Sequence, residues 1–121
     1  MAEHEDVCEY RNHIVYEVVL LRTTPTQAFD AFGKVIWWGG GVLTAGDPKT
    51  LAGSERAVPL GIHEAAQRVR YPECFEYTLS QKSVFPVSAH RGEITFRPVS
   101  EGGEGEGGAT RVVWSIHYTP L

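Results

Sequence analysis

Hydrophobic and polar residues alternate most regularly near the end of the chain, in residues 111–118. Val112, Trp114 and Ile116 fall on one face by the two-residue period of a strand, whereas Arg111 and His117 fall on the other. This alternation predicts a long amphipathic strand. Its apolar face must contact a hydrophobic core, a ligand or another chain.

The same kind of pattern predicts a sheet of about seven strands. The strands are expected at residues 10–21, 42–45, 54–60, 62–69, 74–81, 87–97 and 110–119. Turn residues such as Gly46-Asp47-Pro48 and Tyr71-Pro72-Glu73 separate them. The strands after the helical turns are expected to be antiparallel.

Residues 24–27 carry the signals that begin a helix. Thr24 suits the N-cap, Pro25 the first helical position, and Gln27 stands three residues after the cap, as in a capping box. Gly33 is expected to end this short helix in a left-handed conformation. Residues 35–38 are predicted to form a second short helical turn, so two short helices follow the first strand.

Composition predicts one globular domain. The chain has 121 residues, of which 42% are hydrophobic, enough to bury a core without disulfides or a structural metal. Residues 1–9 are expected to form an acidic tail and residues 10–121 the domain. Within the domain, the glycine- and glutamate-rich residues 101–108 are expected to form a flexible hairpin loop.

Charge and cysteine content exclude several classes of function. The formal net charge is −4 and the basic residues are scattered, which argues against nucleic acid as a partner. Cys8 and Cys74 are far apart in sequence, so free thiols in a reducing compartment are expected. No run approaches the ~20 apolar residues of a membrane span, and the acidic start lacks a signal-peptide pattern. A cytoplasmic location is therefore expected.

Particular residues, in this order, resemble those of a known superfamily. They are Thr24-Pro25 at the first helix, Trp37-Trp38-Gly39 after it, Gly53-Ser54-Glu55-Arg56 on a middle strand, Phe96-Arg97-Pro98, and residues 108–114 near the end. The chain thereby resembles the START-like, polyketide cyclase/dehydrase and lipid-transport superfamily (SRPBCC), which has the helix-grip fold of the birch-pollen allergen.

The resemblance implies an α+β fold and a ligand. A curved antiparallel sheet of six to seven strands would grip the N-terminal helices, with the first strand beside the last. Members of the superfamily bind hydrophobic small molecules between the sheet and a long C-terminal helix. This sequence has no such helix, so either it is a truncated form or the domain covers its sheet with another copy of itself, as a homodimer or larger oligomer.

Three polar residues are candidates for the site. His90 shares a predicted face with Gly92 and Phe96 and is the best general acid/base candidate, although a lone inward histidine is more often a hydrogen-bonded core residue. Arg56 and Glu64 lie on neighbouring predicted strands and could pair at the mouth of a cavity. The alternative, which the sequence favours, is an exposed or structural pair.

Six aromatic residues are candidate walls of a ligand cavity, although aromatic residues at strand spacing more often belong to a core. They are Tyr16, Trp37, Trp38, Tyr77, Phe96 and Trp114. No cofactor is expected. The histidines form no close pair and neither His-x-Glu nor Cys-x-x-Cys occurs, so a metal site is not expected either.

Three functions remain open at this stage. The first is the binding of a hydrophobic or aromatic small molecule, lipid-like or polyketide-like, in a cavity over the sheet. The second is a cyclase or dehydrase type of enzyme in which His90 moves a proton. The third is a protein-interaction module like the co-chaperone relatives with this fold. Fold alone does not choose among them.

Overall fold

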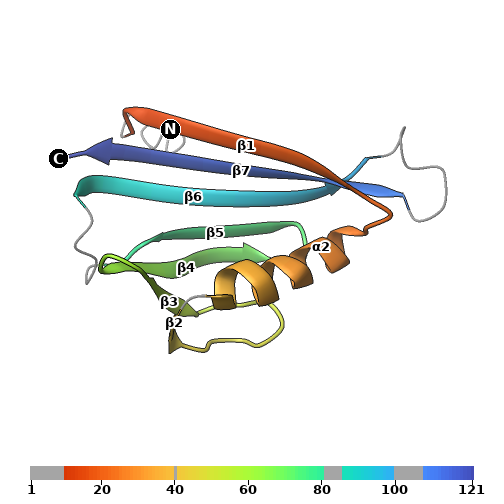
Figure 1. The fold of residues 1–121 in the computed structure, drawn as a ribbon, viewed down its shortest axis with the longest axis horizontal. Coiled ribbons are helices and arrows are strands. Elements are labelled where there is room, and N and C mark those ends of the chain that lie inside the picture. Colours follow the sequence, from red (N-terminus) through yellow and green to blue (C-terminus); the bar gives the residue numbers. More distant parts are fainter. Residues whose placement is uncertain (1–9, 40, 81–85, 100–107) are drawn as a thin grey trace.

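A single antiparallel sheet forms the body of the protein in the computed structural model, which describes residues 10–39, 41–80, 86–99 and 108–121. Its strands are β1 (Asn12–Leu21), β2 (Gly41–Thr44), β3 (Glu55–Val58), β4 (Ile62–Arg70), β5 (Cys74–Leu79), β6 (Val87–Pro98) and β7 (Ala109–Pro120). The order is β1-β7-β6-β5-β4-β3-β2, and the helical segment lies across one face (Figure 1).

The seven predicted strands are confirmed, as is the pairing of the first strand with the last. β1 pairs with β7 over its whole length, with Tyr16 opposite Trp114 and Val18 opposite Val112. Residues on opposite strands that face each other in this way project from the same side of the sheet. The expected tail at residues 1–9 lies outside the described residues, as does most of the expected loop at 101–108.

The helical segment begins as the sequence predicts. In α2 (Pro25–Ala31), the backbone N–H of Gln27 donates to Thr24 Oγ1 at 3.1 Å, and the backbone N–H of Thr24 donates to Gln27 Oε1 at 2.9 Å. This is the reciprocal capping box, which pairs two donors that would otherwise lack partners.

The predicted end of the helix is wrong. α2 continues directly into a π-helical turn, η1 (Phe32–Ile36), and then a 3-10 turn, η2 (Trp37–Gly39), so the two expected helices form one continuous segment. Gly33 is buried inside η1 and is not left-handed. A Cβ atom there would lie 3.4 Å from Leu51 Cδ1, so the glycine lets the 46–53 loop pack closely on the helix.

The hydrophobic core fills the space between this segment and β5 and β6. Phe29 and Phe32 face Phe75 and Phe96, with centroids of Phe29 and Phe96 5.2 Å apart and those of Phe32 and Phe75 also 5.2 Å apart. Phe29, Phe75 and Phe96 are at most 1% exposed. Burial of side chains of this size contributes roughly 1.5–3 kcal/mol each, so these contacts hold the helix on the sheet.

The half of the sheet formed by β7 and β1 is more open. Trp114 on β7 touches the edge of the Phe32 ring, which marks its side of the sheet as the helix side. On that same side of β1, Tyr16 is 63% exposed and Val18 52% exposed, and Ile14 and Leu20 are also exposed. An apolar surface on the helix side of β1 and β7 therefore has no cover among the described residues.

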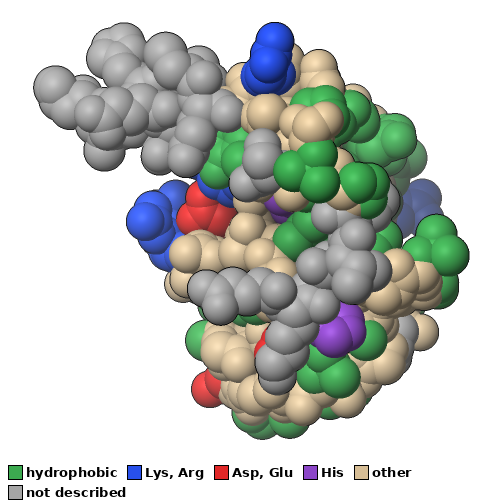
Figure 2. Space-filling model, turned by 90° about the vertical axis from the view of Figure 1, so that its left-hand side faces the viewer, with side chains coloured by type: hydrophobic (Ala, Val, Ile, Leu, Met, Phe, Trp, Pro, Cys, Tyr) green, Lys and Arg blue, Asp and Glu red, His purple; other side chains and the backbone are tan. Residues whose placement is uncertain are grey.

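The opposite face of the sheet carries charged pairs. Arg91 Nε lies 2.9 Å from Glu76 Oε2, and Arg111 pairs with Glu17 across β7 and β1. In the side view of Figure 2, the acidic side chains lie toward the left of the molecule, and hydrophobic side chains are frequent on the right. The helix side of the sheet is thus apolar, whereas the outer face carries charged pairs over β4 to β7 and exposed apolar side chains on β1, namely Val15, Val19 and Leu21.

Candidate functional site

Arg56 and Glu64 form a buried ion pair on the helix side of the sheet. They stand directly opposite each other on β3 and β4, and Arg56 Nε and Nη2 lie 2.8 and 2.7 Å from Glu64 Oε1. The side chains are only 10% and 13% exposed. The predicted pairing is present. Of the two alternatives, the exposed pair is wrong, because the helical segment covers these strands, whereas a structural pair is consistent with its burial.

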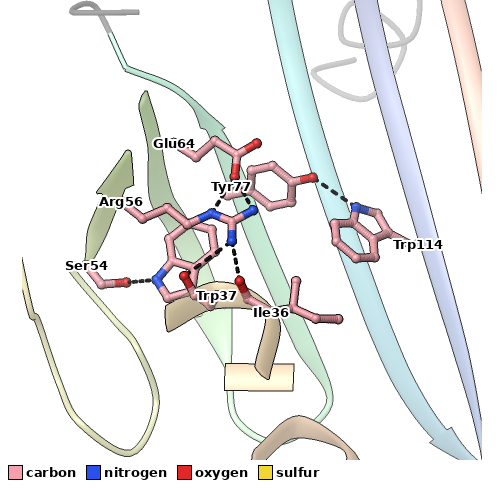
Figure 3. A network of polar contacts seen from close by, with 7 residues as sticks. All are labelled: Ile36, Trp37, Ser54, Arg56, Glu64, Tyr77 and Trp114. Atoms are coloured by element: carbon pink, nitrogen blue, oxygen red, sulfur yellow. Dashed lines mark hydrogen bonds and ion pairs between the residues drawn. The ribbon is translucent and has the colours of Figure 1, made fainter. Parts of the chain in front are cut away.

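Arg56 also ties the helical segment to the sheet. Its Nη1 donates to the backbone carbonyls of Ile36 and Trp37, and its guanidinium lies 4.7 Å from the centroid of the Trp37 ring (Figure 3). The Trp37 indole N–H in turn donates to Ser54 Oγ at 2.9 Å. These contacts give hydrogen-bond partners to the carbonyls at the junction of η1 and η2.

Tyr77 and Trp114 meet in the middle of this face. The indole N–H of Trp114 on β7 donates to the Tyr77 hydroxyl oxygen at 2.9 Å, across the intervening strand β6 (Figure 3). The position opposite Tyr77 on β6 is Gly92, where a Cβ atom would lie 2.2 Å from Tyr77 Cζ. Gly92 therefore leaves the space in which the tyrosine ring lies across β6.

The Tyr77 hydroxyl is held in its neutral form. Burial of the ring and the nearby negative charge of Glu64 raise the pKa of Tyr77 well above its ordinary value. Because the hydroxyl oxygen accepts from Trp114, its own proton remains available to another acceptor, and no described residue takes it. Tyr77 is therefore a hydrogen-bond donor at neutral pH.

His90 lies beside Tyr77 at the same part of the sheet. The two ring centroids are 5.8 Å apart, and burial lowers the pKa of His90 below its ordinary value. The ladder of β5 and β6 ends at Tyr77 and Gly92, so the His90 carbonyl accepts instead from Thr78 Oγ1 at 2.6 Å. The ring atom Nδ1 of His90 is buried and has no hydrogen-bond partner among the described residues.

Some of the candidate residues lie close together in the structure, and others lie elsewhere. The structure brings His90, Arg56, Glu64, Tyr77 and Trp114 together, with Trp37 beneath Arg56, and it places Tyr16 opposite Trp114 on the open strand β1. Phe96 is 1% exposed under the helix. Trp38 lines a different hollow of about 260 Å³, between the helical segment and residues 48–51.

Gly92 and Ser54 are parts of this site to which the sequence analysis gave no role. Ser54 fixes the Trp37 ring, and Gly92 gives the Tyr77 ring its place. A glycine inside a strand pattern is itself a signal of close approach by another group. The register that puts it opposite Tyr77 is a property of the folded sheet, so the sequence pattern alone does not reveal it.

The described part of the chain contains no group of three or more histidine, cysteine, aspartate or glutamate residues able to hold a metal ion. None of its helices is long and apolar enough to cross a membrane. Arg68, Glu76 and Arg91 border a polar hollow of about 280 Å³, and His90 also lines it.

Several solved structures share this arrangement. XoxI from Bacillus cereus aligns with a TM-score of 0.60 at 19% identity, over 92% of this chain and 78% of that one. A protein from Thermobifida fusca aligns with a TM-score of 0.62 at 16% identity, over 90% and 74% of the two chains. Norcoclaurine synthase from Thalictrum flavum, solved in complex with dopamine and hydroxybenzaldehyde, gives 0.59 at 12% identity, over 90% and 69%.

These neighbours are helix-grip proteins of the kind that the sequence resembles, so the fold is confirmed. At such low identities the likeness establishes the fold alone. No protein-family model matches the sequence, and no curated protein matches it significantly.

Proposed function

We propose that this domain binds a hydrophobic or aromatic small molecule on the helix side of β6, β7 and β1. The observation that carries the proposal is the apolar surface there, in which Tyr16 and Val18 are more than half exposed beside the half-buried Trp114. Ligand sites of this kind are mostly apolar, with a few polar groups that fix orientation. The buried Tyr77, whose hydroxyl bonds to Trp114, and the half-buried His90 beside it are the polar groups next to this surface.

The solved neighbours support the proposal at the level of fold. Norcoclaurine synthase, with the same sheet and helix arrangement, has been solved with the aromatic molecules dopamine and hydroxybenzaldehyde bound. In the present chain, Trp114 on β7 and Tyr16 on β1 stand opposite each other. Their rings could stack against an aromatic ligand. Stacking and burial of apolar area would supply the affinity, while the polar groups would give orientation.

Titration with an environment-sensitive apolar dye tests the proposal. The dye should bind with saturable stoichiometry, and Trp114→Ala should weaken binding about tenfold because it removes the largest aromatic surface on β7. Leu60→Ala is the matched control: Leu60 is 84% exposed and lies in the turn between β3 and β4, far along the sheet from β7. Equal effects of the two variants would contradict a defined site.

The second candidate is an enzyme of the cyclase or dehydrase type. It is favoured by the His90 imidazole, whose lowered pKa keeps it neutral near pH 7 and able to accept a proton, and whose Nδ1 has no partner in the described part of the chain. His90→Ala separates the two candidates. Loss of turnover with retained binding supports catalysis, whereas unchanged turnover of a bound substrate would leave the domain as a carrier.

A further inference from the structure

We infer that the ligand of this site is an uncharged molecule, an aromatic or alicyclic body that carries a carbonyl or hydroxyl oxygen, and that carboxylates such as fatty acids are disfavoured. The inference rests on the proposed function and names its ligand class. It follows from the charges and hydrogen-bond donors on the helix side of the sheet.

The positive charge of Arg56 is already engaged. Its Nε and Nη2 are directed at Glu64, its Nη1 at the carbonyls of Ile36 and Trp37, and its face at the Trp37 ring. Four of its five N–H groups are therefore used, by the inventory of a guanidinium. A ligand carboxylate would have to displace Glu64, which would leave a buried carboxylate without its partner.

The strands supply no other arginine or lysine side chain on this face. In β3 to β7, strand alternation and register direct the remaining arginines to the outer face. These are Arg68, Arg70, Arg91, Arg97 and Arg111. An anion that binds on the helix side would consequently lose its hydration without forming an ion pair with the sheet. Burying an unpaired charge in this way is energetically unfavourable.

Neutral donors, by contrast, are available. The Tyr77 hydroxyl accepts from Trp114 and keeps its own proton to donate. The His90 imidazole beside it has a ring nitrogen, Nδ1, that is buried and has no partner among the described residues. A buried polar atom of this kind is usually satisfied by a partner, and a ligand oxygen or hydroxyl would supply one. The negative charge of Glu64 nearby adds repulsion against any anion that approaches Tyr77.

Three naphthalene probes of similar shape test the inference at pH 7.5. They are 2-acetylnaphthalene, a neutral ketone; 2-naphthoate, which is ionised; and naphthalene, which has no polar group. Competition against the apolar dye gives the affinity of each. We expect the ketone to bind at least about tenfold more tightly than the carboxylate.

Tyr77→Phe should lower the affinity for the ketone about threefold to tenfold and leave that for naphthalene unchanged, since only the ketone accepts a hydrogen bond. Tyr71→Phe is the control, because the Tyr71 hydroxyl bonds to Asp30 on the helix at 3.0 Å and is not part of this site. Equal or tighter binding of 2-naphthoate would overturn the inference, as would a loss on Tyr77→Phe that is the same for ketone and hydrocarbon. If no probe binds saturably, the proposed function itself fails, and this inference falls with it.

Discussion

Gly92→Ala is the perturbation that tests the geometry of the site most sharply. A Cβ atom at this position would lie 2.2 Å from Tyr77 Cζ, 2.4 Å from Cε1 and 2.6 Å from the hydroxyl oxygen. The Tyr77 ring is 3% exposed and packs against the rings of Trp37 and Phe75, at centroid distances of 5.8 and 6.1 Å. It therefore has little room to move away, and the substitution should displace it from Trp114.

The expected cost can be worked from these contacts. Overpacking a filled core costs typically about 1–3 kcal/mol, and loss of the hydrogen bond between Trp114 and Tyr77 adds about 1 kcal/mol. Alanine recovers about 0.5–1 kcal/mol relative to glycine in a strand. The free energy of unfolding should therefore fall by about 1–3.5 kcal/mol.

Urea denaturation followed by tryptophan fluorescence measures this change. Gly39→Ala is the matched control, because a Cβ atom at Gly39 meets nothing within 4 Å. The double variant Gly92→Ala with Tyr77→Leu should recover part of the loss, since the branched side chain has no ring to collide with. If the Gly92→Ala protein is as stable as the Gly39→Ala protein, the claim that Gly92 makes room for the Tyr77 ring is refuted.

Two further predictions concern pH and assembly. Burial lowers the pKa of His90 and of His117 in the folded chain below the ordinary value near 6.5. As the pH falls through 6.5, the unfolded chain therefore binds protons that the folded chain does not. The free energy of unfolding measured by urea titration should therefore fall as pH drops from 7 to 5, and His90→Gln should flatten this slope; an unchanged slope would contradict the burial of His90. We also propose that the uncovered apolar side of β1 and β7 makes the chain a homodimer or larger oligomer, since burial of each such side chain contributes roughly 1.5–3 kcal/mol. Sedimentation equilibrium at low micromolar concentration should show self-association that Val18→Lys abolishes, and a clean monomer would contradict it.

Local patterns in the sequence were sufficient to predict the strands and the start of the helix. Alternation fixes which residues of β7 face the core, and the capping box at Thr24 depends on residues only three positions apart. The end of the helix was not predictable in this way. Gly33 reads as a helix terminator, but Leu51 from a distant loop packs on it and the helical segment continues past it.

The site was predictable only in part, for the same reason. Neighbouring strands suggested the pair of Arg56 and Glu64, but its burial depends on the helical segment that lies over it. Gly92 and Tyr77 are fifteen positions apart, and only the register of β5 and β6 shows that one makes room for the other. A glycine inside a strand signals that some group approaches closely, but a single sequence does not show which residue that is.

The central claim, that the helix side of β6, β7 and β1 holds the ligand, is tested most directly by NMR titration of the protein with 2-acetylnaphthalene. The indole N–H signal of Trp114 and the backbone amides of β7 and β1 should shift saturably. The indole signal of Trp37, which is bonded to Ser54 and 1% exposed, should stay in place and serves as the internal control. Shifts confined to the outer face, around Glu76 and Arg91, would contradict the account, as would a titration in which the Trp114 signal does not move.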